Sequence, residues 1–262
     1  MKRIACIGDN CVDYYDETGE SYPGGNPVNV SVYFQRLGSE SSYIGVVGND
    51  ENGEMIIDAL KKKNVDVSHV KVLEGNTSIT HVQRINGDRV FGDNDPGVTE
   101  LISLSDEDIA FIAEHDLVVT GLWGYTEPFL PMIKNQGIPI AYDASNYPSL
   151  AHCREAMKYA DYVFFSDDVA DKDLLQKQMQ DIASMGPNVV VAMRGNLGSI
   201  ALEGERYESF GVIDCNVVDT MGAGDSYIAG FLNAHLEGAD LSECMRKGAK
   251  NAAITIGYKG AW

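Results

Sequence analysis

Two acids, Asp219 and Asp225, enclose a run of small and uncharged residues, Thr220-Met221-Gly222-Ala223-Gly224. After Asp225, apolar residues recur at the spacing of a helix, at Ile228, Phe231, Leu232 and Leu236. Gly222, Ala223 and Gly224 are therefore expected where a loop becomes the N-terminus of a helix. Converging backbone N–H groups and the helix dipole bind an anion at such a point without the help of a lysine.

Asp225 itself is expected on the first turn of this helix. A carboxylate repels phosphate, so it is out of place in a site that only binds phosphate. It fits a general base that takes the proton of a hydroxyl group as that hydroxyl attacks a phosphoryl group. The other interpretation is an ordinary loop with an acidic cap on a helix, and spacing alone does not separate the two. The signatures of P-loop enzymes, protein kinases and dinucleotide-binding folds are absent from the sequence.

The composition restricts the class of protein. The chain has 262 residues, of which 39 are Asp or Glu and 20 are Lys or Arg, so the formal net charge is −19. With 44% hydrophobic residues and 8 prolines it is not a disordered chain, and it is long enough to bury a sizeable core. So acidic a protein is a poor partner for nucleic acid, because phosphate binding requires Lys and Arg. We interpret the charge as a solubilising surface.

The five cysteines and the lack of long apolar runs indicate the compartment. An odd number of cysteines with no C-x-x-C pair argues against a disulfide framework and against a zinc site. The first eight residues are too few to form a signal peptide, and no apolar run approaches the ~20 residues that span a bilayer. We therefore expect a soluble, cytoplasmic protein with neither a membrane nor a nucleic-acid partner.

Short apolar runs alternate with longer amphipathic stretches along most of the chain. The apolar runs predict strands at residues 4–7, 43–47, 116–120, 138–142, 162–165 and 189–192. The amphipathic stretches predict helices at residues 28–37, 53–63, 127–136 and 169–185. This alternation is typical of βαβ units, so we expect an α/β fold with a mainly parallel sheet covered on both faces.

One region departs from this alternation. Residues 76–92 alternate with period two around Asn86-Gly87, which predicts a hairpin, and a second extended stretch at residues 13–22 precedes Pro23-Gly24-Gly25. We expect the two to form a small antiparallel sheet, a lid whose strands lie at approximately 13–23 and 76–93. No linker interrupts the chain, so residues 1–262 are expected to form one domain. Exposed edges of the lid would pair between copies, which predicts a homodimer through the lid.

Three motifs together resemble those of a known family. Asp219 to Asp225, followed by Ala229-Gly230-Phe231-Leu232, resembles the C-terminal signature of the ribokinase-like (PfkB) carbohydrate kinases. The segment Gly24-Gly25-Asn26-Pro27-Val28-Asn29-Val30 resembles the di-glycine signature near the N-terminus of that family, and Gly8 to Asp13 is similar to its sugar-binding segment. The resemblance implies a three-layer α/β/α fold with a small β-sheet lid. It also implies transfer of the γ-phosphate of ATP to a primary hydroxyl group of a sugar.

The resemblance assigns roles to individual residues. Asp225 would be the base, and Gly222, Ala223 and Gly224 would form the hole for the transferred phosphoryl group. The sugar would be held by Asp9, Asp13, Gly25, Asn26 and Asn29, since carboxylate oxygens accept hydrogen bonds from neighbouring hydroxyl groups. The alternatives are that Asp9 and Asp13 are turn residues after a strand and that the glycines are a hinge of the lid.

Other segments resemble the family members that act on sugars joined to an amine. They are residues 88–93, Trp123-Gly124 and Gly260-Ala261-Trp262. This resemblance implies O6 of fructoselysine, or of a related fructosamine, as the acceptor. Arg89 and Asp93 would lie near the pocket, with Asp93 binding the ammonium group, and Trp123 would form a wall for the sugar. A solvated hairpin and a core aromatic are the alternatives, and ribose, fructose or a nucleoside are alternative substrates.

ATP is expected along the turn that follows a late strand, with Arg194, Gly195 and Gly198 in contact with it. Thr220 and Asn251 are further expected contacts, and the family implies a monovalent cation such as K⁺ beside Asp219 and the Met221 carbonyl. One departure concerns Mg²⁺: the family's Asn-x-x-Glu is replaced by Ser166-Asp167-Asp168-Val169. Asp167 could hold Mg²⁺ instead, because Mg²⁺ needs few direct carboxylates, whereas Asp168 could also be a helix cap. The missing motif leaves a non-catalytic sugar or nucleotide sensor as the rival function.

Overall fold

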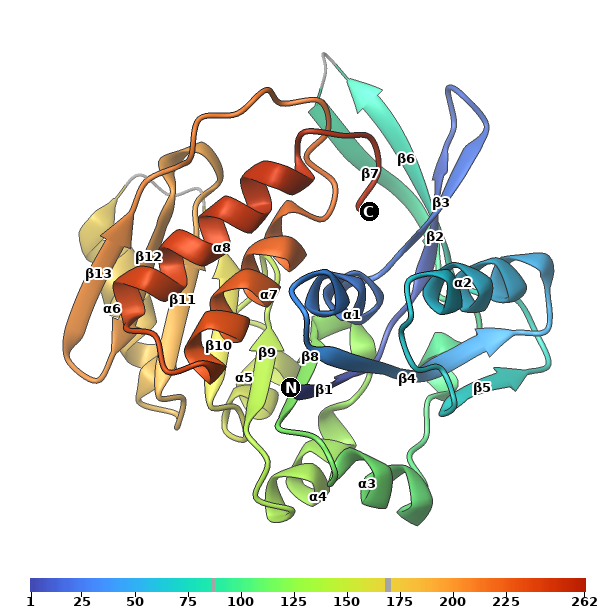
Figure 1. Cartoon of the computed structure of the whole chain (residues 1–262), viewed down its shortest axis with the longest axis horizontal. Helices are drawn as coiled ribbons and strands as arrows, with labels where there is room; N and C mark the ends of the chain where they lie inside the picture. Colours follow the sequence, from blue (N-terminus) through green and yellow to red (C-terminus); the bar gives the residue numbers. More distant parts are fainter. Residues whose placement is uncertain (86–87, 168–170) are drawn as a thin grey trace.

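The computed structural model describes residues 1–85, 88–167 and 171–262. Within these ranges it describes every side chain except those of residues 84, 85 and 88–91. A nine-stranded sheet runs through the centre in the order β13-β12-β11-β10-β9-β8-β1-β4-β5 (Figure 1). Its strands are β1 (Arg3–Ile7), β4 (Glu40–Gly48), β5 (Val70–Leu73), β8 (Leu117–Gly121), β9 (Ile140–Asp143), β10 (Tyr162–Ser166), β11 (Val189–Met193), β12 (Ser199–Glu203) and β13 (Arg206–Phe210). All neighbours pair in parallel except β11–β12 and β12–β13, which are antiparallel.

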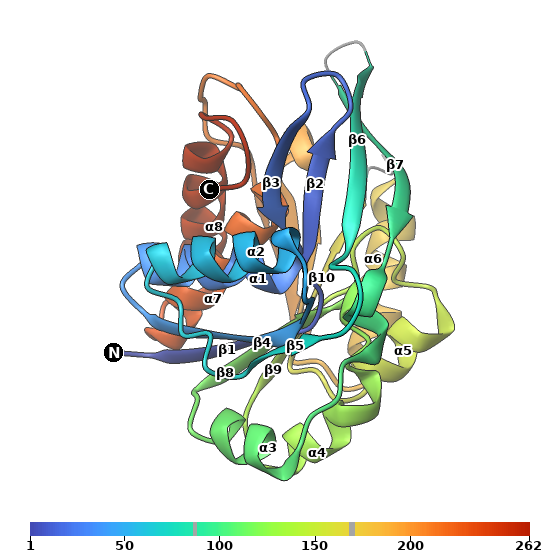
Figure 2. The ribbon, with the colours of Figure 1, turned by 90° about the vertical axis from the view of Figure 1, so that its right-hand side faces the viewer.

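Helices cover both faces of this sheet, as Figure 2 shows edge-on. One face carries α1 (Asn26–Arg36), α2 (Glu51–Lys62), α7 (Ala223–Leu236) and α8 (Leu241–Thr255). The other carries α3 (Asp106–Ile112), α4 (Leu130–Asn135), α5 (Ala151–Met157) and α6 (Lys172–Ala183). Short 3₁₀ helices are η1 (Gly97–Leu101), η2 (Leu122–Gly124), η3 (Glu127–Phe129) and η4 (Gly195–Leu197).

The strands at the centre of the sheet are apolar on both faces because both faces are covered. In β1, Ile4 and Cys6 belong to the core under α1 and α7, whereas Ala5 and Ile7 belong to the core on the opposite side. The predicted α/β fold with a mainly parallel sheet is therefore confirmed. In the part of the chain that the structure describes, no helix is long and apolar enough to cross a bilayer.

A four-stranded sheet projects from the carboxyl-terminal edge of the large one (Figure 1). Its order is β3-β2-β6-β7, from β2 (Cys11–Tyr15), β3 (Glu20–Gly24), β6 (Ile79–Ile85) and β7 (Asp88–Asp95). The expected lid thus exists, but the expectation that it is antiparallel throughout is wrong, because β2 and β6 pair in parallel. Both strands leave the same edge of the large sheet, β2 after β1 and β6 after β5, so they run in the same direction. The predicted turn at Asn86-Gly87 lies outside the described residues.

Several boundaries also differ from the predictions. The helix expected at 127–136 is divided into η3 and α4, each of which has a proline in its first turn. The helix expected from residue 169 begins at Lys172, where the Asp171 side chain accepts hydrogen bonds from the amides of residues 173 and 174. Asp168, the other candidate cap, lies outside the described residues. The extended stretch at 13–22 is two strands joined by a turn.

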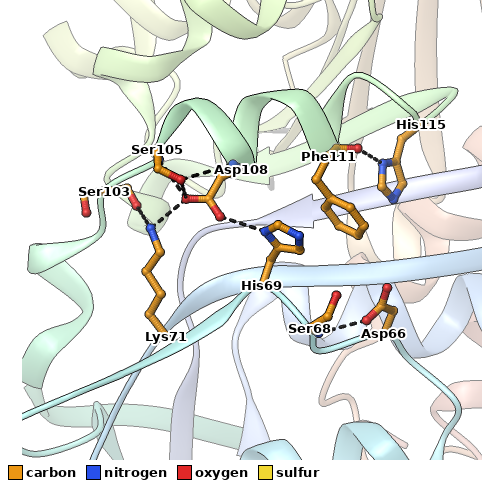
Figure 3. Close-up of polar contacts among 9 residues, drawn as sticks. All are labelled: Asp66, Ser68, His69, Lys71, Ser103, Ser105, Asp108, Phe111 and His115. Carbon is orange, nitrogen blue, oxygen red and sulfur yellow. Dashed lines mark hydrogen bonds and ion pairs between the residues drawn. The ribbon is translucent and has the colours of Figure 1, made fainter.

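An ion-pair cluster fastens the edge of the large sheet to α3 (Figure 3). The Asp108 carboxylate accepts hydrogen bonds from His69 Nδ1 at 2.8 Å, from Lys71 Nζ at 2.7 Å and from the Ser105 hydroxyl at 2.8 Å. Ser105 and Asp108 also form a capping box at the start of α3, and the His69 ring stacks on Phe111. Burial raises the pKa of Asp108, but these hydrogen bonds outweigh burial and hold the pKa well below its usual value.

Candidate active site

A cavity of about 470 Å³ lies between the lid and the carboxyl-terminal edge of the large sheet. Acids reach it from three elements: Asp9 follows β1, Asp143 ends β9, and Asp225 stands on the first turn of α7. The lid contributes Asp13, on β2. Of the predicted sugar-site residues, the structure brings Asp9, Asp13, Gly25, Asn26, Asn29, Trp123 and Asp225 to the wall of this one cavity.

Two asparagines from the first turn of α1 hold Asp225. Asn26 Nδ2 donates to Asp225 Oδ1 at 2.7 Å, and Asn29 Nδ2 donates to Asp225 Oδ2 at 2.7 Å. Asn26 Nδ2 also donates to Asp143 Oδ2 at 3.0 Å, so one amide joins two carboxylates. The helix begins with Asn26-Pro27, and proline at its start needs no hydrogen-bond acceptor for the missing N–H.

The three acids around Asn26 are stronger bases than free carboxylates. Burial raises the pKa of Asp225 to about 6, although the hydrogen bonds from Asn29 and Asn26 act in the opposite direction. Burial, and then the charge of Asp225, raise the pKa of Asp9 to about 7 and that of Asp143 to about 7. A carboxylate with a pKa near 6 is still ionised at neutral pH and can accept a proton, which suits a general base.

The start of α7 is shaped by Gly222, which caps the helix in the left-handed conformation with φ of 71°. A Cβ atom at Gly222 would lie 2.4 Å from the Tyr33 hydroxyl oxygen and 2.9 Å from the Ala261 Cβ atom, so only glycine fits. The first N–H groups of a helix have no acceptor within that helix. The Ala223 amide donates to the Thr220 carbonyl at 3.3 Å, and the Gly224 amide belongs to the first turn beside Asp225, where the anion hole was predicted.

The di-glycine pair allows the lid to approach the sugar site closely. A Cβ atom at Gly24 would lie 2.4 Å from Asp13 Oδ2, and one at Gly25, where φ is 104°, would lie 2.7 Å from the Asn10 Cα atom. Asp13 is only 4% exposed, and Cys11 Sγ donates to Asp13 Oδ1 at 3.4 Å. The glycines thus leave room for Asp13 to stand at the cavity wall.

The outer wall of the cavity is aromatic. Trp123, from η2, is 53% exposed, and its ring packs edge-to-face against Tyr147 with 6.0 Å between the centroids. The structure does not bring Asp93 to this wall: it is exposed on β7, and its neighbours Gly92 and Asn94 line the cavity instead. In a strand, successive side chains point to opposite faces, which explains the difference. The side chain of Arg89 lies outside the described part of the structure.

The residues predicted for the nucleotide lie beyond the wall of this cavity. Arg194, Gly195 and Gly198 form the turn after β11, closed by a bond from the Arg194 amide to the Gly198 carbonyl at 2.8 Å. Met193, which precedes this turn, lies near the start of α7, because a Cβ atom on Gly224 would lie 3.7 Å from the Met193 Cε atom. Thr220 is exposed beside Gly222, whereas Asn251 donates to the Ser226 carbonyl at 2.8 Å and joins α8 to α7.

Of the predicted cation ligands, Asp219 uses both carboxylate oxygens within the protein. Asp219 Oδ1 accepts from the Met221 amide at 3.0 Å, and Asp219 Oδ2 accepts from the Gly260 amide at 3.0 Å. Asp167 follows β10, and its amide donates to the Met193 carbonyl at 3.0 Å. Among the described residues, no group of three His, Cys, Asp or Glu side chains is arranged to hold a metal ion.

The sequence analysis missed several residues that line the cavity, among them Asn10, Asn94, Thr99, Asn146, Tyr147 and, above all, Asp143. The available signal for Asp143 was its place directly after the apolar run at 138–142, since ligands of parallel sheets bind at the carboxyl ends of the strands. Asn10 follows β1 within the segment Gly8 to Asp13 that resembles the family's sugar-binding segment, whereas Asn94 and Thr99 gave no signal, because only the folded lid and η1 bring them to the cavity.

Comparison with known proteins agrees with this geometry. The family model described as pfkB family carbohydrate kinase matches residues 1–262. The fructoselysine 6-kinase of Shigella flexneri is 38% identical over 262 residues, which is all of both chains. The fructosamine kinase FrlD of Bacillus subtilis (strain 168) is 36% identical over 270 aligned positions, covering 100% of this chain and 93% of the relative.

Solved structures show the same fold. The ribokinase of Arabidopsis thaliana, complexed with ribose and ATP, superposes with a TM-score of 0.90 at 20% identity, over 99% of this chain and 94% of that one. An uncharacterized sugar kinase from Pyrococcus horikoshii in complex with ATP gives a TM-score of 0.80 at 26% identity, over 99% and 94% of the two chains. The chain therefore belongs to the pfkB family of carbohydrate kinases and is an ATP-dependent sugar kinase, as its motifs predict.

Proposed function

We propose that the enzyme transfers the γ-phosphate of ATP to O6 of a fructosamine, of which fructoselysine is the best candidate. The observation that carries the proposal is the pairing of Asp225, held by Asn26 and Asn29, with a cavity that is acidic on several sides. A sugar joined to an amine carries a positive charge that such a cavity attracts, whereas a plain sugar does not. The names of the relatives that are 36–38% identical support the same substrate class.

In the proposed reaction, Asp225 accepts the proton of the O6 hydroxyl group while O6 forms a bond to the γ-phosphorus atom. The bond between that phosphorus and the oxygen bridging to the β-phosphate breaks, and ADP leaves with the electron pair. The two asparagines keep the Asp225 carboxylate in place. The amides of Gly222, Ala223 and Gly224 stabilise the negative charge of the phosphoryl group in the transition state.

The lid and the sugar-binding residues position the acceptor in this scheme. Asp13, on β2, accepts hydrogen bonds from sugar hydroxyl groups, Asp9 lines the same cavity, and the backbone at Gly25 leaves room for the ring. Trp123 covers the outer side of the sugar. Because the lid strands stand over the cavity, bound sugar excludes water that would otherwise hydrolyse ATP.

ATP is proposed to lie along the turn of Arg194, Gly195 and Gly198, with Thr220 and Asn251 on the opposite side. This placement is supported by the approach of Met193 to Gly224, which joins that turn to the anion hole. Mg²⁺ would neutralise phosphate charge; Asp167 is the described acid at the end of β10 that could bind it, mostly through water. A potassium ion beside Asp219 and the Met221 carbonyl is the proposed monovalent site.

We also propose a homodimer through the lid, in the cytoplasm. The outer strands of the lid sheet are β3 and β7, and each has one edge that another copy could extend. Light scattering tests the dimer, and a monomer at micromolar concentration would contradict it. The five cysteines, none of them in a disulfide, suit a reducing compartment.

The experiment that tests the function is coupled ADP release with Mg-ATP and a panel of acceptors. Fructoselysine, psicoselysine, fructose, ribose and adenosine cover the substrate classes that remain open. Turnover restricted to the lysine-linked sugars, with the phosphate on O6 by phosphorus NMR, is the expected result. Turnover of plain sugars at equal efficiency would overturn the fructosamine assignment but keep the kinase. Binding without any ADP release would favour the sensor and point to the missing Asn-x-x-Glu motif.

A further inference from the structure

Four carboxylates line the cavity. Asp9, Asp13, Asp143 and Asp225 all line it, and no Lys, Arg or His does so among the residues whose side chains the structure describes. Charges buried without a partner are costly, so proteins seldom keep them unless a ligand supplies the opposite charge. The general base and the hydroxyl-binding Asp13 account for two of the four. Asp9 and Asp143 remain without an assigned role.

These two acids flank the same asparagine. Asp9 Oδ2 accepts from the Asn26 amide at 3.3 Å, and Asp143 Oδ2 accepts from Asn26 Nδ2 at 3.0 Å. The amide of Ser145 donates to Asp143 Oδ1 at 2.9 Å. Asp9 Oδ1 is buried with no hydrogen-bond donor among the described residues. The pair thus has fewer donors than its oxygens can accept, next to the carboxylate that acts as base.

A second observation, independent of the acids, also indicates a missing ligand. Asn10 and Thr99 line the cavity and are only 1% and 3% exposed. Asn10 Oδ1 and Thr99 Oγ1 have no hydrogen-bond partner in the part of the chain that the structure describes. Asn10 is fixed in place, since its Nδ2 donates to the Tyr43 hydroxyl at 2.8 Å and to the Val46 carbonyl at 2.6 Å. Buried polar atoms of this kind are satisfied by a bound molecule or by ordered water, and both reach them through this cavity.

We propose that Asp9 and Asp143 form an ammonium subsite that binds the protonated amine joining the sugar to its amino-acid portion. This inference rests on the proposed function and adds to it the residues that select the substrate. A secondary ammonium group has one positive charge and two N–H donors, one for each carboxylate. Trp123 and Tyr147 stand at the open side of the cavity, where an aliphatic chain leaving the amine would pass.

This assignment replaces the one made for Asp93. That residue is exposed on the lid and outside the cavity wall, whereas Asp143 lies within hydrogen-bond distance of the amide that also holds the base. Asp143 comes from the rigid large sheet rather than from a hairpin. Selectivity built on a strand end is more precise than selectivity built on a loop.

The test compares two acceptors of the same shape in the wild-type enzyme. One is fructoselysine, and the other is its ether analogue, in which oxygen replaces the linking nitrogen and the charge is lost. We expect kcat/KM to favour the amine on the order of 100-fold, because a site built for N–H donors rejects a ligand without them. Equal kcat/KM for the two compounds would overturn the subsite and leave the kinase assignment intact.

Two variants assign the selectivity to residues. Asp143→Asn and Asp9→Asn are each expected to lower kcat/KM for the amine at least tenfold more than they lower kcat/KM for the ether. The matched control is Asp58→Asn, an exposed acid on α2, which should preserve the wild-type ratio. An equal loss with both acceptors would show a structural role and overturn the assignment.

Failure of the proposed function has a different signature. If neither compound is phosphorylated by the wild-type enzyme, the fructosamine kinase assignment is wrong. Calorimetric binding of the amine and the ether then decides the subsite without turnover. Tighter binding of the amine in the wild type, lost in Asp143→Asn, supports the subsite, and equal binding overturns it. Circular dichroism of each variant verifies folding, and the wild-type comparison stands even where a variant does not fold.

Discussion

The indole Nε1–H of Trp262 donates to Asn29 Oδ1 at 2.8 Å. The Nδ2 atom of the same asparagine donates to Asp225 Oδ2 at 2.7 Å. Because the amide oxygen of Asn29 accepts the hydrogen bond from the indole, the amide group cannot flip without losing both hydrogen bonds. Trp262 packs against the cores on both sides of α1. We therefore infer that Trp262 is a positioning residue for Asp225, the proposed base, and acts on it through Asn29.

Replacing Trp262 by Phe tests this relationship. The variant keeps an aromatic ring but removes the donor, so Asn29 is no longer held in one orientation. We expect kcat to fall about tenfold, the equivalent of one hydrogen bond, with little change in KM for the sugar. The hydrogen bond from Asn29 lowers the pKa of Asp225, so the acid limb of the pH–rate profile should move to higher pH.

The matched control for that variant is Lys63→Met. Lys63 Nζ lies 5.7 Å from the centre of the Trp262 ring but contributes nothing to the bond with Asn29. Its replacement should leave both kcat and the pH–rate profile unchanged. A Trp262→Phe enzyme with the wild-type profile and a lower melting temperature would show that the indole serves only packing.

Asp225→Asn tests the base directly. The side chain keeps its size, so the fold should persist, but the amide cannot accept the proton of the acceptor hydroxyl. Since general bases contribute roughly 10²- to 10⁴-fold, we expect ADP release to fall by about 10³-fold. Steady-state kinetics with the best acceptor, at saturating Mg-ATP, gives the value. Turnover within a few-fold of wild type would reject Asp225 as the base.

The activity should depend on pH in the range set by Asp225. Its pKa is raised to about 6, so the carboxylate is protonated, and unable to act as a base, below that pH. We therefore expect kcat/KM to rise with pH up to the range of about 6 to 7, in which Asp225, Asp9 and Asp143 become ionised, and then to level off. Since Asp9 and Asp143 lie close by, the measured value belongs to the group of acids rather than to one residue. A profile that is flat down to pH 5 would contradict this.

The elements that position these acids could be predicted because they depend on local patterns. Apolar runs at 4–7 and 138–142 became central strands with acids after them, and the helix expected after Asp225 begins at Ala223. Apolar periodicity and glycine placement act within a few residues of the chain, and the sequence displays both. For the same reason the sequence alone indicates Asp225 and Gly25 as candidate site residues, and both line the cavity.

Contacts between distant segments could not be predicted in the same way. The bond between Trp262 and Asn29 joins residues 233 positions apart, and Asn26 meets Asp143 across 117 positions. No periodic pattern of apolar residues in the sequence indicates such pairs. The predicted antiparallel direction of β2 relative to β6 was wrong for a related reason. Alternation of apolar and polar residues predicts a strand but not the strand that pairs with it. Asp93 was assigned to the cavity on its position in a hairpin, and the face it occupies depends on the register of β7.

Gly222→Ala separates the shape of the anion hole from general strain. The new methyl group would lie 2.4 Å from the Tyr33 hydroxyl, so the start of α7 must shift and the amides of the hole move with it. The control is Gly238→Ala, where φ is 85° but a methyl group meets no atom within 4 Å. Both variants should lose about 1 kcal/mol of unfolding free energy from the left-handed conformation. Only Gly222→Ala should lose most of its kcat, and equal activity of the two would argue against the hole.

Asp108→Asn tests the ion-pair cluster of Figure 3, far from the chemistry. Since the pKa of Asp108 is held below the usual value of 3.8, its carboxylate stabilises the fold above about pH 4 and loses this contribution as the pH falls further. The Asp108 side chain is 4% exposed, so removing its charge should cost about 2 kcal/mol of unfolding free energy at pH 7, through weaker hydrogen bonds from His69 and Lys71. Urea denaturation at pH 7 and at pH 3 measures the difference, which should shrink at the lower pH. The same variant should keep the wild-type kcat, because α3 lies on the side of the sheet away from α1 and α7 (Figure 2). A loss of stability that is equal at both pH values would show that packing around Asp108, and not its charge, holds the edge of the sheet to α3.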